Sequence, residues 1–168
     1  MEQALISGVA VDGDEAKITL VGVPDRPGVA AALFRAIADE GVNVDMIVQN
    51  VSHEGRTDIS FTAPKADVPL LRTILDRVAA ATGAATHQVD DGIAKISLVG
   101  AGMKTNPGVA AEMFEALAEQ RVNIEMISTS TIRISCVVRA ADADRAVRAV
   151  HAKFELGQEP AAAPRAEG

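Results

Sequence analysis

The sequence has no tryptophan, no tyrosine, four phenylalanines and a single cysteine among its 168 residues. One cysteine excludes a framework of intrachain disulfides. That residue, Cys136, lies in the apolar run from Ile132 to Val138, so we expect a buried small hydrophobic side chain rather than a nucleophile. Hydrophobic residues make up 48% of the chain, which predicts a substantial core of aliphatic side chains, alanine and methionine.

Positive charge is scarce as well, because 16 Lys and Arg residues stand against 23 Asp and Glu residues and give a net charge of −7. Proteins that bind nucleic acids usually have a basic face, and single-strand binders add stacking aromatic side chains. No nucleic-acid partner is therefore expected.

No run reaches the roughly 18 apolar residues that span a membrane, and the N-terminal MEQALISGVA does not resemble a signal peptide. We expect a cytoplasmic protein without membrane contact.

The motifs of common catalytic and metal sites are missing too. The three histidines, His53, His87 and His151, are too far apart in the chain for a metal-ligand motif. The sequence contains no GxxxxGKS/T, GxSxG or HExxH motif, and Gly100-Ala101-Gly102 is only a fragment of a glycine-rich loop. We therefore expect no catalytic residue, no metal and no cofactor in this chain.

An internal repeat organises the chain. The segment from Gly28 to Asn50 aligns without gaps with the segment from Gly108 to Ser130, at a shift of 80 residues, and 11 of the 23 aligned positions are identical. A repeat of this length is a whole small domain, because solenoid units have about 20–50 residues. The sequence therefore predicts two tandem modules that arose by duplication.

Each copy contains the same order of predicted elements. Lys17–Gly22 alternates like a strand, and the helix after it begins near Pro27 and ends at Gly41. The first copy continues with strands at 43–51, 57–61 and 85–89 and a helix at 68–80. The second copy has strands at 94–100, 123–129 and 132–138 and helices at 107–120 and 142–154. The order βαββαβ predicts an α+β fold of two ferredoxin-like modules.

The second copy lacks its fourth strand, but a spare strand precedes the first copy. Ala4–Val11 has strand character and no counterpart between the copies. We therefore expect this N-terminal strand to complete the sheet of the second module, so that the two modules pack together as one unit. The expected division is a first module at 14–91, a second module at 92–157 with the strand 3–11, and a disordered tail at 158–168.

A Pro-Gly turn precedes the first helix of each copy, at Pro27-Gly28 and at Pro107-Gly108. Free amides and the positive end of the helix dipole favour a carboxylate at such a turn. Glycine would let a ligand approach the backbone, and Asp25 could pair with an ammonium group. These groups together suit an amino-acid zwitterion. The turn would also start a helix well without any ligand, but its presence in both copies favours a function.

The strand after each of these helices mixes asparagine and an acid with apolar residues. Asn43 and Asp45 alternate with apolar residues in the first copy, as Asn123 and Glu125 do in the second. This alternation is typical of a solvated sheet face, and it also suits a face that meets a partner module and completes a ligand pocket. More hydrogen-bonding groups end these strands, at Gln49, Asn50, Ser128, Thr129 and Ser130.

Four segments, VPDRPGVAAALF, VNVDMIVQNVS, KISLVGAGMKTNPGVAAEMFEALAEQRVNIEMISTS and IRIS, resemble the regulatory region of aspartokinase, which consists of two ACT domains. The resemblance covers Met1 to about Leu156 and includes no catalytic kinase domain. It implies a separate regulatory β subunit of an α₂β₂ enzyme, or equally a C-terminal fragment of the full enzyme. The chain would form a homodimer through its ACT modules and bind the catalytic α subunit, which alone uses ATP.

The resemblance also implies feedback control of a biosynthetic pathway. The catalytic partner phosphorylates L-aspartate, the first step towards lysine, threonine and methionine, and L-threonine, L-lysine or both inhibit it by binding between the first module of one chain and the second module of another. By motif, the first site takes Asp25, Gly28, Val29, Ala30 and Gln49, closed by Asn123 and Ile124. The second takes Met103, Lys104, Gly108, Val109, Ala110, Ser128, Thr129 and Ser130, closed by Asn43, Val44 and Asp45.

One position departs from the family motif STSEIRIS, because Thr131 stands in place of its acid. If that acid contacts a lysine side chain, lysine binding at the second site is weakened. Threonine is therefore expected at the first site, and the effector of the second site stays open.

Three alternative functions of the chain also remain open. They are an ACT sensor for another biosynthetic enzyme, a dimerisation module without ligand, and an acylphosphatase-type enzyme, for which Arg26 or Lys104 would have to bind the anion.

Overall fold

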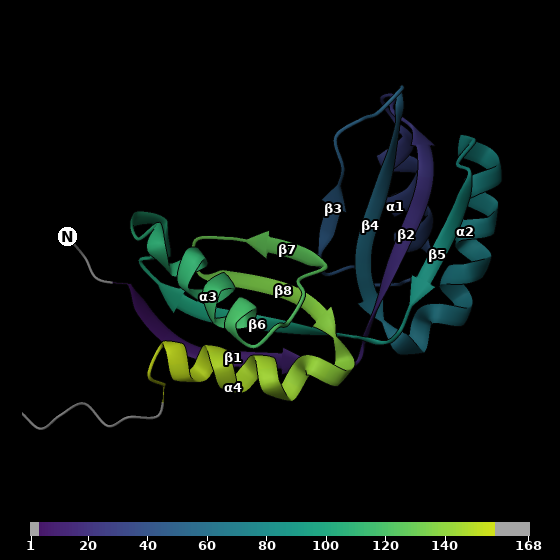
Figure 1. The fold of residues 1–168 in the computed structure, drawn as a ribbon. Helices are drawn as coiled ribbons and strands as arrows, with labels where there is room; N and C mark the ends of the chain where they lie inside the picture. Colours follow the sequence, from purple (N-terminus) through teal and green to yellow (C-terminus); the bar gives the residue numbers. More distant parts are fainter. Residues whose placement is uncertain (1–3, 157–168) are drawn as a thin grey trace, which may run out of the picture.

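Two four-stranded antiparallel sheets, each covered on one face by two helices, form the framework of the chain (Figure 1). The computed structural model describes residues 4–156, apart from the side chain of Lys104. The strands are β1 Leu5–Asp12, β2 Glu15–Pro24, β3 Ile47–Gln49, β4 Arg56–Pro64, β5 Thr86–Asp90, β6 Ile93–Ala101, β7 Met126–Thr129 and β8 Arg133–Arg139. The helices are α1 Val29–Asp39, α2 Val68–Thr82, α3 Gly108–Glu119 and α4 Ala143–Lys153, with short 3₁₀ helices at Lys65–Asp67, Met103–Thr105 and Ala140–Asp142.

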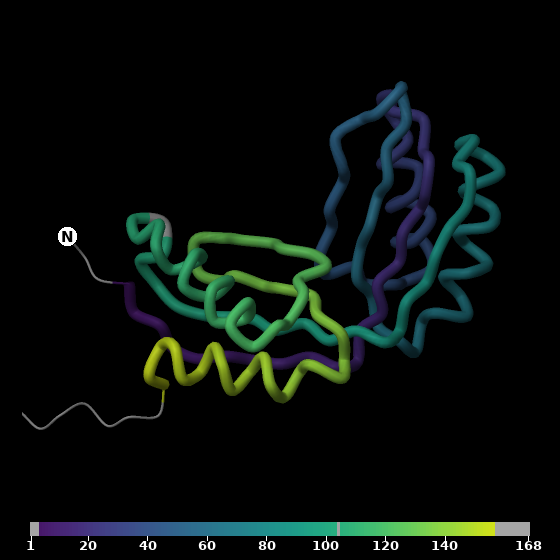
Figure 2. Tube along the Cα trace, in the orientation of Figure 1, coloured from purple at the N-terminus to yellow at the C-terminus, as the bar shows by residue number. Residues whose placement is uncertain are grey.

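The N-terminal strand β1 crosses into the second module, as the sequence predicts. The first sheet has the order β3-β4-β2-β5 and the second the order β1-β6-β8-β7. Strand β1 pairs antiparallel with β6, from Leu5 opposite Ala101 to Asp12 opposite Lys95. Figure 2 follows the chain as it passes between the modules twice, after β1 and after β5. Residue 3 and the predicted tail at 158–168 lie outside the described residues.

The strands that follow α1 and α3 are shorter than predicted. The predicted strand at 43–51 is reduced to β3, and the one at 123–129 begins only with β7. Just before β3, the Met46 amide donates to Thr62 Oγ1 at 3.0 Å, the Thr62 amide donates to Met46 O at 3.0 Å, and the Asp45 amide donates to Thr62 O at 3.0 Å. The segment before β3 therefore follows β4 without regular strand geometry.

Each module has its own hydrophobic core between its sheet and its helices. Phe34 and Phe61 meet edge to face in the first core, with ring centroids 5.6 Å apart. Cys136 lies fully buried in the second core, and burial raises the pKa of its thiol to about 12. The expectation that Cys136 is a buried hydrophobic residue is thus confirmed.

Among the described residues, no helix combines the length and the apolar character needed to cross a membrane.

The two modules touch through a third cluster of side chains, here called the module contact. Its apolar part consists of Met46, Val48, Ile93, Met126 and Val137. Two ion pairs flank it, Lys17 with Glu125 and Lys95 with Asp45. Both lysines alternate with core residues of their strands, so they lie on the helix-free faces of the sheets. The predicted packing of the two modules as one unit is therefore present.

Candidate functional site

A β-bulge positions the turn that leads into α1. The register between β2 and β4 shifts between Leu20 and Val23, and Gly22 adopts a φ of 63° there. The Gly22 amide donates to Asp58 Oδ1 at 2.9 Å. A Cβ on Gly22 would lie only 3.0 Å from Cβ of Ala85, so both the conformation and the space favour glycine. The bulge turns the end of β2 towards the start of the helix.

The turn encloses the first of two candidate cavities, with a volume of about 180 Å³. All five residues predicted to form the near side of the first site line this cavity: Asp25, Gly28, Val29, Ala30 and Gln49. The remaining lining residues are Val23, Pro24, Arg26, Pro27, Thr57 and Ile59. The structure thus gathers the turn, the first turn of α1 and the strands β2, β3 and β4 around one space.

The polar groups of this cavity match those expected for a zwitterion. The N-terminus of α1 has no side-chain cap, so amides of the first turn are left for a ligand. The Asp25 carboxylate is exposed and forms no ion pair within the described part of the chain. Gly28 has a φ of 95° and open space where a Cβ would lie. Its backbone conformation, and not only the approach of a ligand, explains glycine at this position.

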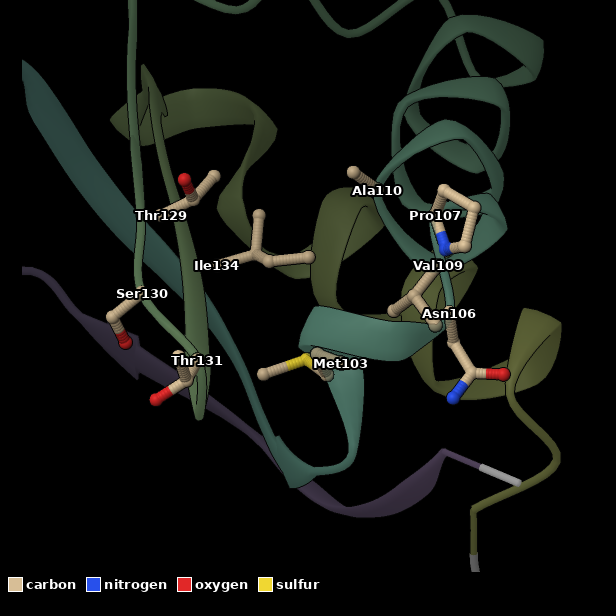
Figure 3. A pocket seen from close by; sticks show the side chains of 9 residues that line it. All are labelled: Met103, Asn106, Pro107, Val109, Ala110, Thr129, Ser130, Thr131 and Ile134. Atoms are coloured by element: carbon tan, nitrogen blue, oxygen red, sulfur yellow. The ribbon is translucent and has the colours of Figure 1, made fainter. Parts of the chain in front are cut away.

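The second cavity lies at the equivalent place in the second module and has a volume of about 370 Å³. Figure 3 shows Thr129, Ser130 and Thr131 on one side of it, the start of α3 on the other, and Met103 between them. Its lining residues are Met103, Asn106, Pro107, Val109, Ala110, Thr129, Ser130, Thr131 and Ile134. Of the predicted near side, Gly108 and Ser128 do not line the cavity, and the side chain of Lys104 is not described.

The turn of the second module differs from that of the first. The Val109 amide donates to the Asn106 backbone oxygen at 3.2 Å, so one amide at the start of α3 is already engaged. The Asn106 side chain donates to Gly102 O at 2.7 Å and so closes the loop before the helix. Among the lining residues that the structure describes, none has a charged side chain. This cavity therefore offers hydroxyls and apolar surface, whereas the first offers a carboxylate.

The residues predicted to close the two sites line neither cavity within the described chain. Val44 and Ile124 are half-buried against the cores of their own modules, and Asn43 and Asn123 are exposed. Asp45 lies beside Lys95 at the module contact. Because these residues were assigned to act across two chains, the assignment stays a prediction.

Sequence reasoning missed residues that reach the cavities from neighbouring strands. Ile59 lies opposite Gln49 in the β3–β4 pair, and Ile134 lies opposite Thr129 in the β7–β8 pair. The strands themselves were predicted, but an alternating pattern does not define which residues face each other across them. Only the register of the pairing could have pointed to these side chains.

Comparisons with known proteins match both modules of the chain. The family model described as ACT domain matches residues 17–83, and a second ACT-domain model matches residues 96–154. The crystal structure of the regulatory subunit of aspartate kinase from Thermus thermophilus is 43% identical, with a TM-score of 0.85 over 89% of this chain and 99% of that one. The chain belongs to the aspartokinase regulatory family. A structure of aspartokinase alpha and beta subunits is also 43% identical, with a TM-score of 0.84 over 90% of this chain and 99% of that one.

Curated aspartokinases extend beyond the region that this chain matches. The aspartokinase of Corynebacterium efficiens is 50% identical over 159 residues, which make up 94% of this chain but 38% of the relative. The chain thus corresponds to the pair of ACT domains of an aspartokinase and spans less than half of the length of these relatives.

Proposed function

We propose that this chain is the regulatory part of an aspartokinase and binds a free amino acid at its two helix-start cavities. Binding of L-threonine in the first cavity would inhibit the phosphorylation of L-aspartate by a catalytic partner that carries the ATP site. The observation that carries the proposal is the pair of cavities built on duplicated Pro-Gly turns in a chain of this family. Membership in the aspartokinase family favours this function over a sensor for another enzyme.

The first cavity has the polarity and size for a small zwitterion. Amides at the start of α1 would bind the carboxylate, and Asp25 would bind the ammonium group. The volume of about 180 Å³ leaves room for a short side chain, and the polar side chains of Gln49 and Thr57 lie in the lining for a hydroxyl. These features support threonine.

The second cavity is larger and its described lining residues are uncharged, so its effector is a separate question. The hydroxyl side chains of Thr129, Ser130 and Thr131 lie on one wall, and the described lining includes no carboxylate that could meet a lysine ammonium group. We expect a neutral amino acid to bind there more tightly than lysine. Titration of the chain with threonine and with lysine, each followed by calorimetry, would separate the two.

The mechanism would be a shift between two arrangements of the chains. An effector that touches two chains stabilises one arrangement, and its effect is limited by its differential affinity for the two. We propose a homodimer through the ACT modules that binds two catalytic α subunits, in the cytoplasm. The related structure that contains alpha and beta subunits supports a catalytic partner of this kind.

The decisive test removes the carboxylate of the first cavity. Asp25→Ala should weaken threonine binding about tenfold, or about 1.4 kcal/mol, because the ammonium group loses its partner. Isothermal titration calorimetry measures the change. Asp39→Ala is the matched control, since Asp39 is an exposed acid of α1 that pairs with Arg35 and lies outside the cavity. Wild-type affinity in Asp25→Ala would contradict the site.

A further inference from the structure

The module contact consists of two related halves. Lys17 and Lys95 occupy the same position in the repeated segments AKITLVG and AKISLVG, and Asp45 aligns with Glu125 at the shift of 80 residues. Each lysine contacts the acid of the other module: Lys17 Nζ lies 2.8 Å from Glu125 Oε1, and Lys95 Nζ contacts Asp45 Oδ2. The duplication has thus produced an approximate two-fold axis within one chain.

The half that contains Glu125 is balanced in charge. Arg139 Nε donates to Glu125 Oε2 at 2.7 Å, and Arg139 also pairs with Asp90. Two acids therefore face the two cations Lys17 and Arg139. Burial alone would raise the pKa of Glu125, but hydrogen bonds from Arg139 and Lys17 outweigh it and hold the pKa below its usual range.

The other half has more acid than base. Lys95 contacts Asp45 and also lies 3.6 Å from Oε1 of a second acid, Glu15. Glu15 is only 8% exposed. Its other oxygen, Oε2, is buried and has no hydrogen-bond partner among the described residues. Such an orphaned, buried carboxylate oxygen is costly while the group stays charged.

Two substitutions between the repeats explain the imbalance. Glu15 faces Pro64 across the β2–β4 pair, and the equivalent pair in the second module joins Ile93 and Arg139. The first module therefore has an acid where the second has a fully buried isoleucine, and a proline where the second has the arginine. The half around Lys95 therefore contains one more acid and one cation fewer than the half around Lys17.

We propose that Glu15 and Asp45 hold one proton between them at the module contact, so that the contact between the modules weakens when this proton is lost. The groups that face Glu15 are Lys95 from β6, Asp45 from the segment before β3, and Asp12 at the end of β1. Arg133, at the start of β8, acts on Asp45 alone. One lysine thus stands against three acids, which are Glu15 itself, Asp45 and Asp12.

The directions of the two pKa shifts place the proton on Glu15. Burial raises the pKa of Glu15, and Lys95 lowers it only in part. The charge of Asp45, and the hydrogen bond that a protonated Glu15 would donate to Asp45, raise it further. Burial would raise the pKa of Asp45 too, but hydrogen bonds from Lys95 and Glu15 outweigh burial and lower it. A protonated Glu15 that donates to a charged Asp45 satisfies both carboxyl groups.

We expect a proton, and not a metal ion, to neutralise the excess negative charge around Lys95. No group of three or more His, Cys, Asp or Glu residues in the described part of the chain is placed to hold a metal. Asp45 also ends the segment 43–45, which we assigned to the closure of an effector site. If that assignment holds, proton loss at the module contact would reach the site through Asp45, and this extension rests on the proposed function.

The test compares urea unfolding of the full chain, without effector, between pH 4.5 and pH 8. Glu15→Gln keeps the shape of the protonated acid and cannot lose the proton. Because the native pKa of Glu15 lies above its ordinary value of 4.5, the contribution of Glu15 to wild-type stability should fall as pH rises through this range, and Glu15→Gln should not show this loss. The urea midpoint of Glu15→Gln should therefore exceed the wild-type midpoint at pH 8, and the gap should close towards pH 4.5.

Glu125→Gln is the matched control in the balanced half. Since the pKa of Glu125 is lowered, its charged form stabilises the fold throughout this pH range, and its loss begins only below about pH 4.5. Glu125→Gln should therefore lower the midpoint by an amount that is the same at pH 5 and pH 8. A gap between Glu15→Gln and wild type that does not change with pH, or that has the opposite sign at pH 8, overturns the proposal.

Carbon-13 NMR of the side-chain carboxyl groups provides a second, residue-specific test. The Glu15 carboxyl carbon should titrate above the ordinary glutamate range, and Asp45→Asn should move that titration to lower pH. A Glu15 carbon that titrates in or below the ordinary range overturns the proposal. Neither experiment uses an effector, so failure of the chain to bind threonine would overturn the proposed function and leave these results unaffected.

Discussion

Gly100, near the end of β6, shows how one residue can control the crossing of β1. A Cβ at Gly100 would lie 2.5 Å from Leu5 O and 3.1 Å from Ile6 Cα. Backbone atoms cannot turn aside as a flexible side chain can, so any larger residue must displace β1. The close approach falls where the register of the β1–β6 pair shifts, between Ile6 and Gly8.

Gly100→Ala should therefore destabilise the chain by about 1–3 kcal/mol, in the range of overpacking substitutions. Gly8→Ala is the matched control, because Gly8 lies on the partner strand and has nothing within 4 Å of a new Cβ. Urea unfolding of both variants measures the difference. Equal stability of the two variants would show that β1 adapts to the methyl group without cost.

At the scale of elements, β1 belongs to the sheet of the second module, although the whole first module lies between β1 and β6 in the sequence. It pairs with β6 along nearly its whole length, and Ile6 and Val9 pack against the core of the second module. Without β1 this sheet would end at β6 and leave a row of unpaired backbone groups and apolar surface exposed.

Deletion of residues 1–12 should therefore unfold or loosen the second module while the first keeps its own sheet and core. Hydrogen exchange followed by NMR or mass spectrometry distinguishes the modules, and the strands β2 and β4 serve as the internal control. Protection of β6 and β8 at wild-type levels in the deletion variant would contradict a structural role of β1.

The elements also show where prediction from sequence succeeded and where it stopped. Apolar spacing located every helix to within a few residues, because one helix face must be buried regardless of what covers it. The strand at 43–51 was predicted too long, because its alternating pattern continues through residues that form no regular ladder with β4. At Met46 the amide contacts the side chain of Thr62, and this contact spans 16 residues of sequence and leaves no periodic pattern.

At the scale of the whole molecule, short segments of chain connect the duplicated cavities to the module contact. The cavities lie at the helix starts, and the segments that follow the same helices lead to Asp45 and Glu125 in the module contact. A ligand that orders either region would stabilise the arrangement of both modules. The chain should therefore respond to its effector as a unit rather than one module at a time.

Threonine at about 100 times its dissociation constant should raise the unfolding free energy by about 2.7 kcal/mol, by mass action for one site that exists only in the folded chain. Valine is the control ligand, because it has the same shape with a methyl group in place of the hydroxyl. Thermal unfolding with each amino acid measures the shift. An equal shift with valine would show that the hydroxyl is not recognised.

The sequence by itself determined the duplication, the order of elements, the crossing of the N-terminal strand and the two Pro-Gly turns, because each leaves a local or periodic trace in the chain. Only the tertiary structure decided which residues meet. The lining by Ile59 and Ile134 depends on strand register, and Glu15, unremarkable in the sequence, meets Lys95 because two modules pack face to face. Contacts of this kind are set by burial and pairing between distant segments, which no local pattern encodes.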